Sequence, residues 1–189
     1  YDGGIQHSSA IPLAGKNITI DISHRFKTTL EQAEELKLNH GIAKTALASD
    51  EKIKIKGIKG RESTEITQKL LSEVIEPRMI EILSLSLDEI KKSNVVNKLN
   101  FGVVITGGGS QLNNIIDLSQ EIFNMPIKIG YPELIDNEVS QYKNNPRYAT
   151  AIGIIQYASI DNMDDFNNSN EIGIIDKIKK TFKKITNWY

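Results

Sequence analysis

Three consecutive glycines, Gly107, Gly108 and Gly109, are the residues whose type and spacing best suit ligand binding. They follow an apolar run, Val103–Ile105, that is too short and too rich in β-branched residues for a helix and predicts a buried strand. A backbone without Cβ atoms can turn sharply, expose its N–H groups and admit a flat or anionic ligand.

From Ser110 onward, apolar residues recur every three or four positions, which predicts a helix with Ser110 as its cap. A strand, a glycine turn and a helix together make half of a nucleotide site. The dinucleotide fingerprint and the Walker loop both need further glycines or a Gly-Lys-Ser/Thr sequence that is absent here. Taken locally, the glycines could equally make only a tight structural turn.

The composition predicts one ordinary globular core with room for a small second lobe. The 189 residues are 39% hydrophobic and 25% charged, and their net charge of −1 gives no global attraction to nucleic acid. The chain has no cysteine, its three histidines have no ligand-like spacing, and no metal site is predicted. Because Tyr1 is not methionine and residues 1–4 resemble a hairpin turn without its first strand, we expect the C-terminal part of a longer protein.

The first half of the chain predicts strands, then a capped helix. Alternating Ile18, Ile20 and Ile22 indicate one or two strands within residues 5–22. Thr28 or Thr29 can cap a helix over residues 30–38 that stops near Gly41. Glu34 and Lys37 stand three apart and so share one face of that helix, where the simplest interpretation is a solvated ion pair.

Residues 48–98 predict a small lobe inserted into the main domain. Ile53 and Ile55 alternate with lysines in an amphipathic strand over residues 53–58. An apolar stripe from Ile66 to Ile90 then predicts a long helix that Pro77 kinks or restarts near Glu76.

After the glycine turn, residues 127–129 predict a short strand and residues 132–146 a polar connection. A helix is expected from Arg147 to Ser159, and residues 148–157 are assigned to the core rather than to chemistry.

The end of the chain predicts a tethered amphipathic helix. Residues 161–172 are too polar to fold and indicate a disordered linker. Residues 173–189 place apolar and aromatic side chains within an arc of roughly 140°, namely Ile174, Ile175, Ile178, Phe182, Ile185, Trp188 and Tyr189. Lysines fill the other face, namely Lys177, Lys179, Lys180, Lys183 and Lys184. This pattern favours an anionic membrane surface over docking on protein.

Several of these segments together resemble a known family. The run from Ile105 to Ser110 resembles the adenosine motif of the actin, Hsp70 and sugar-kinase ATPase superfamily. The helix with Glu34 and Lys37, residues 102–132, residues 148–157 and the terminal helix are, in this chain order, similar to the FtsA family of bacterial cell-division proteins. The resemblance covers residues 1–159 and the terminal helix.

The resemblance implies an α/β, actin-like (ribonuclease-H-like) ATPase fold, of which this chain is the back half. Residues 1–47 and 99–160 would form subdomain 2A, and residues 48–98 subdomain 2B. The implied cofactor is ATP, with Mg²⁺ in the full-length protein. Its adenosine would lie against Gly107, Gly108 and Gly109, with Glu34 and Lys37 reaching ribose and adenine.

The resemblance also implies partners. Gly60-Arg61 and the Glu-Pro-Arg ending at Arg78 match positions where the family binds the C-terminal tail of the tubulin-like protein FtsZ. Arginine suits an acidic, amphipathic peptide because its fork pairs with carboxylates while its stem packs on apolar groups. Taken singly, a surface arginine is usually only solvated.

The function implied is that of a protein that tethers FtsZ filaments to the cytoplasmic face of the membrane and self-assembles with other division proteins at the septum. Hydrolysis of ATP would be at most slow, and no catalytic residue is assigned because the phosphate-gripping loops of the superfamily are not found here. Three alternatives stay open: a small-molecule kinase, an Hsp70-like ATPase and an FtsA-like pilus-assembly scaffold. The adenosine turn fits the first two, but the terminal helix does not.

Overall fold

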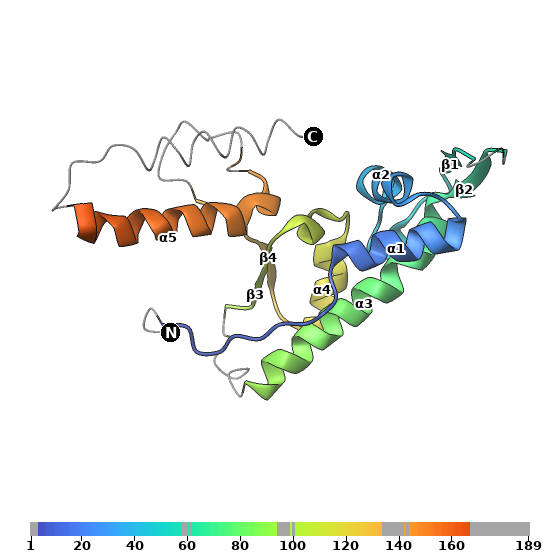
Figure 1. The fold of residues 1–189 in the computed structure, drawn as a ribbon. Helices are drawn as coiled ribbons and strands as arrows, with labels where there is room; N and C mark the ends of the chain where they lie inside the picture. The colour runs from blue at the N-terminus through green and yellow to red at the C-terminus, as the bar shows by residue number, and fades with distance from the viewer. Residues whose placement is uncertain are drawn as a thin grey trace.

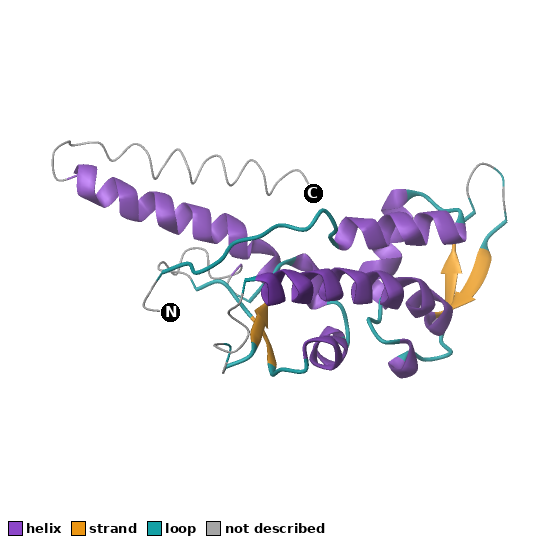
Figure 2. Ribbon diagram, turned by 90° about the horizontal axis from the view of Figure 1, so that it is seen from below, coloured by secondary structure: helices purple, strands orange, loops and turns teal. Residues whose placement is uncertain are grey.

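The structure is a computed structural model that describes residues 4–57, 60, 62–93, 99, 101–133, 142 and 144–166. In Figure 1 the helices α1 and α2 and the strands β1 and β2 gather at one end, and β3, α4 and β4 lie in the middle. Helix α3 runs from that end into the middle of the molecule, where it packs against α4 (Figure 1). Helix α5 projects from the opposite end, away from the other described elements (Figures 1 and 2).

Helix α1, Gly15–Phe26, replaces the strands expected within residues 5–22. Ile18 and Ile22 are buried and stand four residues apart, a spacing that puts both on one helical face. The spacing of Ile18, Ile20 and Ile22 therefore agrees with both a strand and a helix. The segment is a helix because Ile18 and Ile22 pack against other helices. The backbone N–H of Ala14 donates to Asn17 Oδ1 at 2.9 Å and helps to start the helix.

Helix α2, Leu30–His40, confirms the capped helix. The Thr29 hydroxyl accepts a hydrogen bond from the Gln32 backbone N–H at 3.2 Å, and the helix ends at Gly41. Ala33 and Leu36 are buried on the face that packs against α1.

Strand β1, Lys52–Ile55, is the amphipathic strand that the lysine alternation predicts, with Ile53 and Ile55 buried. It pairs antiparallel with β2, Thr64–Thr67, which was not predicted because Ile66 fits the helical stripe that follows. In the structure Ile66 lies opposite Ile53 across the pair.

Helix α3, Gln68–Lys92, begins at a cap in which the Thr67 hydroxyl accepts from the Leu70 N–H at 3.1 Å. The helix continues through Pro77, so the restart expected near Glu76 does not occur. Buried Leu71, Ile75, Met79 and Leu83 confirm the apolar stripe.

Strand β3, Val103–Ile105, helix α4, Ile115–Phe123, and strand β4, Ile127–Ile129, form a crossover unit in which the two strands are parallel. Both strands were predicted, but the helix begins at Ile115 instead of Ser110. Ser110 lies in a 3-10 turn, η3, Gly108–Gln111, where its hydroxyl donates to the Gly107 carbonyl at 2.8 Å. Ser110 therefore forms its hydrogen bond inside the turn and is not the cap of α4. Asn114 is the residue before the helix.

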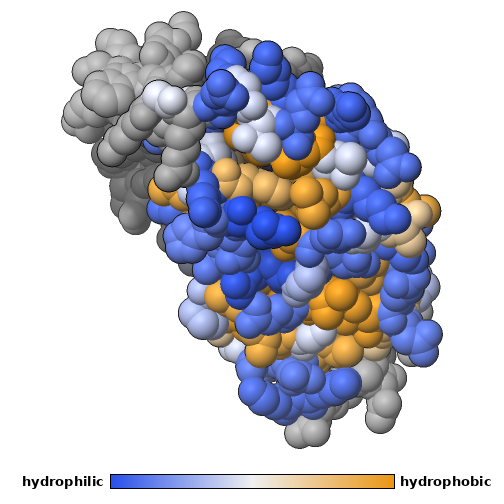
Figure 3. All heavy atoms as spheres, turned by 90° about the vertical axis from the view of Figure 1, so that its right-hand side faces the viewer, coloured by the Kyte–Doolittle hydropathy of each residue, from blue (hydrophilic) through white to orange (hydrophobic). Residues whose placement is uncertain are grey.

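One hydrophobic core joins α1, α3 and α4, with Ile22, Leu71, Ile75 and Leu118 among its buried members. Helix α3, expected in the inserted lobe, thus packs against elements on both sides of the expected boundaries at 48 and 98. At the end of the molecule formed by α1, α2, β1 and β2, apolar side chains interrupt the polar surface (Figure 3). Leu30 and Leu38 of α2 are exposed in this part of the fold.

Helix α5, Ala149–Phe166, follows the short 3-10 helix η5, Pro146–Tyr148, and confirms the closing helix. Ile152 is buried as expected, but Ile154 and Tyr157 are 65% and 69% exposed, so assigning the whole of 148–157 to the core was wrong. The helix reaches Phe166, so the linker expected from residue 161 does not begin there. The terminal helix at 173–189 and Arg61 lie outside the described residues.

Candidate functional site

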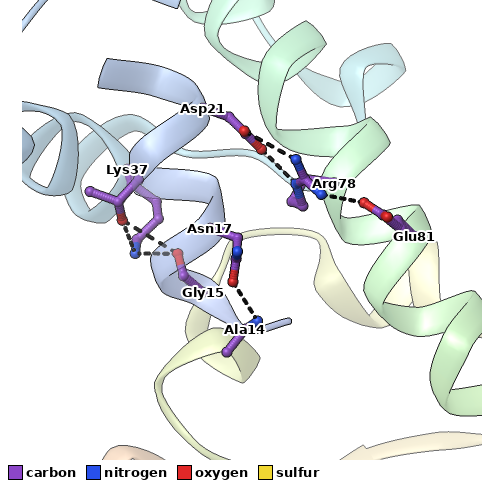
Figure 4. A network of polar contacts seen from close by, with 8 residues as sticks. Ala14, Gly15, Asn17, Asp21, Lys37, Arg78 and Glu81 are labelled. Carbon is purple, nitrogen blue, oxygen red and sulfur yellow. Dashed lines mark hydrogen bonds and ion pairs between the residues drawn. The ribbon is translucent and has the colours of Figure 1, made fainter. Parts of the chain in front are cut away.

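Glu34 and Lys37 are not an isolated surface pair but part of a polar cluster between α2 and α1. The Lys37 ammonium donates to Glu34 Oε2 at 2.7 Å, to Thr19 Oγ1 at 2.8 Å and to the Gly15 carbonyl at 3.1 Å. The Thr19 hydroxyl donates to the same Glu34 oxygen. The bond from Lys37 to Gly15 is drawn in Figure 4. The cluster therefore ties the start of α1 to the middle of α2.

The two charged side chains of the cluster differ in what they can offer a ligand. The side chain of Lys37 is 13% exposed and uses its three donors on the protein, whereas that of Glu34 is 43% exposed. Burial alone would raise the pKa of Glu34, but hydrogen bonds from Lys37 and Thr19, with the positive charges of Lys37 and Arg147, lower it below its ordinary value. Glu34 therefore stays ionised at neutral pH and is the group that a ligand can reach.

The glycine turn presents bare backbone. Gly108 and Gly109 are exposed, and a Cβ on Gly109 would meet no atom within 4 Å. A Cβ on Gly108 would meet only Arg147 Cγ, at 3.8 Å. The backbone conformation that requires glycine is at Gly107, with φ 88° and ψ 176°, whereas Gly108 has no positive φ.

Two backbone hydrogen bonds join this turn to its neighbours, one to the segment after α2 and one to η5. The Ala43 N–H donates to the Asn113 carbonyl at 2.8 Å, which joins the chain leaving α2 to the chain leaving the turn. The Gly107 N–H donates to the Pro146 carbonyl at 3.1 Å, which joins η5 to the turn. Glu34, the glycines and η5 are thus held around one region of the surface. A pocket beside the turn, at the carboxyl ends of β3 and β4, is lined by Ser110, Asn113, Tyr131, Asn144 and Pro146 among others.

Sequence reasoning missed Thr19 and Arg147. Thr19 belongs to α1, which was expected as strand, so no spacing argument could bring it to α2. Arg147 follows Asn145 and Pro146 in the sequence and lies beside Gly108 only because η5 folds back on the turn.

Arg78, expected to bind an acidic peptide, is engaged by acidic side chains of the protein (Figure 4). Its Nε donates to Asp21 Oδ2 at 2.6 Å, its Nη2 donates to Asp21 Oδ1 at 3.1 Å, and its Nη1 donates to Glu81. The side chains of Arg78 and Asp21 are 27% and 28% exposed. Arg78 thus ties α3 to α1.

Within the ranges that the structure describes, no helix is long and apolar enough to cross a membrane. The same described ranges contain no group of three or more histidine, aspartate or glutamate side chains placed to hold a metal ion.

The parallel strands, the glycine turn at their carboxyl ends and the helical layer define an actin-like α/β fold. Two solved structures are similar to it. MreB 5 of Spiroplasma citri bound to AMPPNP matches with a TM-score of 0.63 and 16% identity, over 84% of this chain and 47% of that one. The same protein bound to ADP matches with a TM-score of 0.59 and 17% identity, over 84% and 48%.

The chain belongs to the FtsA family, because the family model "Cell division protein FtsA" matches residues 1–153. FtsA of Pseudomonas aeruginosa is 34% identical over 157 residues, which are 82% of this chain and 37% of that protein. FtsA of Escherichia coli K12 is 34% identical over 83% of this chain and 39% of that protein. FtsA of Buchnera aphidicola from Acyrthosiphon pisum is 31% identical over 100% and 46%. The chain therefore spans less than half the length of these relatives.

Proposed function

We propose that this chain forms the adenosine side of the ATP site of an actin-like cell-division protein. The observation that carries the proposal is the exposed glycine backbone held beside the ionised Glu34. MreB 5, which shares the fold, is described as bound to AMPPNP and to ADP, which supports a nucleotide as the ligand.

The residues divide the work of binding between them. The bare backbone at Gly108 and Gly109 lets a flat base approach to contact distance. The Glu34 carboxylate accepts hydrogen bonds from ribose hydroxyls, and charged acceptors make such bonds strong. Lys37 and Thr19 hold that carboxylate in place and do not reach the ligand themselves.

ATP bound at this site would bring Mg²⁺ with its phosphates, and hydrolysis would be at most slow. No residue of this chain is assigned to the chemical step. For the experiments below, the full-length protein means a protein of the relatives' length that contains this chain.

Nucleotide titration of the full-length protein tests the proposal. Gly108→Val should abolish ATP binding because a branched side chain fills the space of the base, while thermal melting stays close to that of wild type. A mutant that is folded and binds ATP as well as wild type would return the turn to a structural role.

We propose further that the full-length protein links FtsZ filaments to the cytoplasmic face of the membrane and assembles with itself and with other division proteins at the septum. Membership of the FtsA family supports this, together with the amphipathic pattern of residues 173–189. The FtsZ tail would dock at Arg78 and Arg61, where a ligand carboxylate must compete with Asp21 and Glu81 for Arg78. Binding of an FtsZ tail peptide to wild type and Arg78→Ala tests this part.

A further inference from the structure

Arg147 lies at the edge of the proposed nucleotide site, and its guanidinium group is not paired with any described residue. The residue is exposed, and its side-chain stem lies beside Gly108, 3.8 Å from where a Cβ would be. Within the described part of the chain, the guanidinium has no ion pair or hydrogen bond. It is therefore free to meet a ligand that lies on the glycine turn.

The backbone of Arg147 is fixed on both sides even though its guanidinium is not. The Asn145 side chain accepts from the Arg147 N–H at 3.0 Å, and the carbonyl of buried Pro146 accepts from the Gly107 N–H. On the other side, Tyr148 packs its ring edge-on against Tyr142, with 4.9 Å between ring centroids. Arg147 is thus held in place relative to the turn.

Glu34 lies on the far side of the same region. The charge of Arg147 reaches Glu34 strongly enough to help lower the pKa of that carboxyl, yet the two side chains form no ion pair. The two charged groups therefore lie further apart than an ion pair, and the stem of Arg147 lies beside the exposed Gly108. Solvent weakens the attraction between exposed opposite charges, so both groups are available to a ligand.

The chemistry of Arg147 and Glu34 indicates which part of a nucleoside each side chain would bind. Guanidinium is planar and stacks on aromatic faces, whereas a carboxylate accepts hydrogen bonds from hydroxyls. A purine has the face and its ribose has the hydroxyls. Because the stem of Arg147 lies beside Gly108, where the base is proposed to lie, the base is the part of the ligand nearest to that stem.

We propose that Arg147 stacks on the purine base of the bound nucleotide and so determines affinity for the nucleoside part of the ligand. This inference rests on the proposed nucleotide site and adds a residue to it that neither the glycine turn nor the Glu34 helix contains.

The test compares adenosine with ATP in the full-length protein and its variants. Arg147→Met keeps the apolar stem but removes the plane and the charge, and should weaken binding of adenosine and ATP by the same factor, about five- to tenfold. Arg147→Lys restores the charge without the plane and should recover little of that loss. Lys69→Met, which makes the same charge change at an exposed position on α3, is the control and should bind both ligands like wild type.

The outcomes separate the inference from the function it rests on. If Arg147→Met weakens ATP alone and Arg147→Lys restores it, Arg147 contacts phosphate and the stacking assignment is overturned. If both variants bind adenosine and ATP like wild type, the inference fails while the nucleotide site stands. If wild type binds neither ligand, the site itself is wrong and Arg147 has no role in it.

Discussion

Asp21 of α1 and Arg78 of α3 form an ion pair at two points, with Nε to Oδ2 at 2.6 Å and Nη2 to Oδ1 at 3.1 Å. Such fork-to-carboxylate pairing fixes the arginine in direction as well as in charge. An acidic peptide would therefore meet an arginine that two carboxylates already neutralise, Asp21 and Glu81.

Asp21→Asn removes one competing charge, so binding of an FtsZ tail peptide to the full-length protein should strengthen by about two- to fivefold, as expected for a partly exposed pair worth up to about 1 kcal/mol. Peptide titration measures this change in affinity. Asp88→Asn, which removes a carboxylate from an exposed position further along α3, is the matched control. Weaker binding in Asp21→Asn would mean that the pair must stay closed for the peptide to dock.

Arg78→Glu should weaken both peptide binding and the fold. The new carboxylate would face Asp21 and Glu81, and like charges at such distances destabilise. A loss of about 1 kcal/mol lowers the melting temperature of a chain of this size by roughly 2–4 °C. Thermal melting and peptide titration are run on the same samples. An unchanged melting point would contradict a structural role for this arginine.

Gly107 should be the most sensitive glycine of the turn for stability. Its φ of 88° with ψ of 176° is a region open almost only to glycine, so Gly107→Ala should cost about 1–3 kcal/mol. Gly109→Ala is the control, because its Cβ would lie in open space and its φ is not positive. Chemical denaturation of both variants gives the difference, and equal stabilities would refute the conformational argument.

Glu34 should contribute stability that depends on pH. Its pKa is lowered in the folded chain from the ordinary 4.5, so the folded state binds fewer protons there than the unfolded state. The contribution is present above pH 4.5 and is lost as pH falls through the lower, folded pKa. Glu34→Gln should therefore flatten the stability profile below pH 4.5, measured by denaturation across pH, with exposed Glu35→Gln as a control. The same slope in Glu34→Gln and wild type would contradict the cluster.

The terminal segment should bind anionic vesicles through its apolar arc. Trp188→Glu removes a large ring from that arc and adds a negative charge, so co-sedimentation with anionic lipid should fall. Asn187→Glu makes a comparable charge change on the opposite side of the expected helix and should have a smaller effect. Added salt should loosen attachment because the lysines are screened. Equal binding of Trp188→Glu, or equal binding to neutral lipid, would favour docking on protein.

The sequence predicted correctly the elements whose hydrophobic spacing agrees with only one kind of secondary structure. The Thr29 cap and Gly41 bounded α2, and the β-branched run before the glycines identified β3. The strands expected within residues 5–22 were wrong because isoleucines at 18, 20 and 22 satisfy a strand and a helix alike. Only the burial of Ile18 and Ile22 in the core that α1 shares with α3 decides between them.

The residues of the candidate site also differ in whether the sequence could indicate them. Glu34 and the glycines could be proposed from the sequence because each belongs to a contiguous motif. Thr19 and Arg147 were not, because their roles depend on contacts between segments far apart in the sequence, such as the bond from Gly107 to Pro146. Arg78 was identified by motif, but its pairing with Asp21 could not be predicted while α1 was expected as strand.

Helix α1 carries Thr19, which is bonded to Glu34, and two residues later Asp21, which is bonded to Arg78. The proposed nucleotide site and the proposed peptide site thus each contain a residue that is hydrogen-bonded to α1. A ligand that displaces Thr19 from Glu34 acts on the element that positions Asp21. Thermodynamic linkage then requires that any change nucleotide makes in peptide affinity equals the change peptide makes in nucleotide affinity.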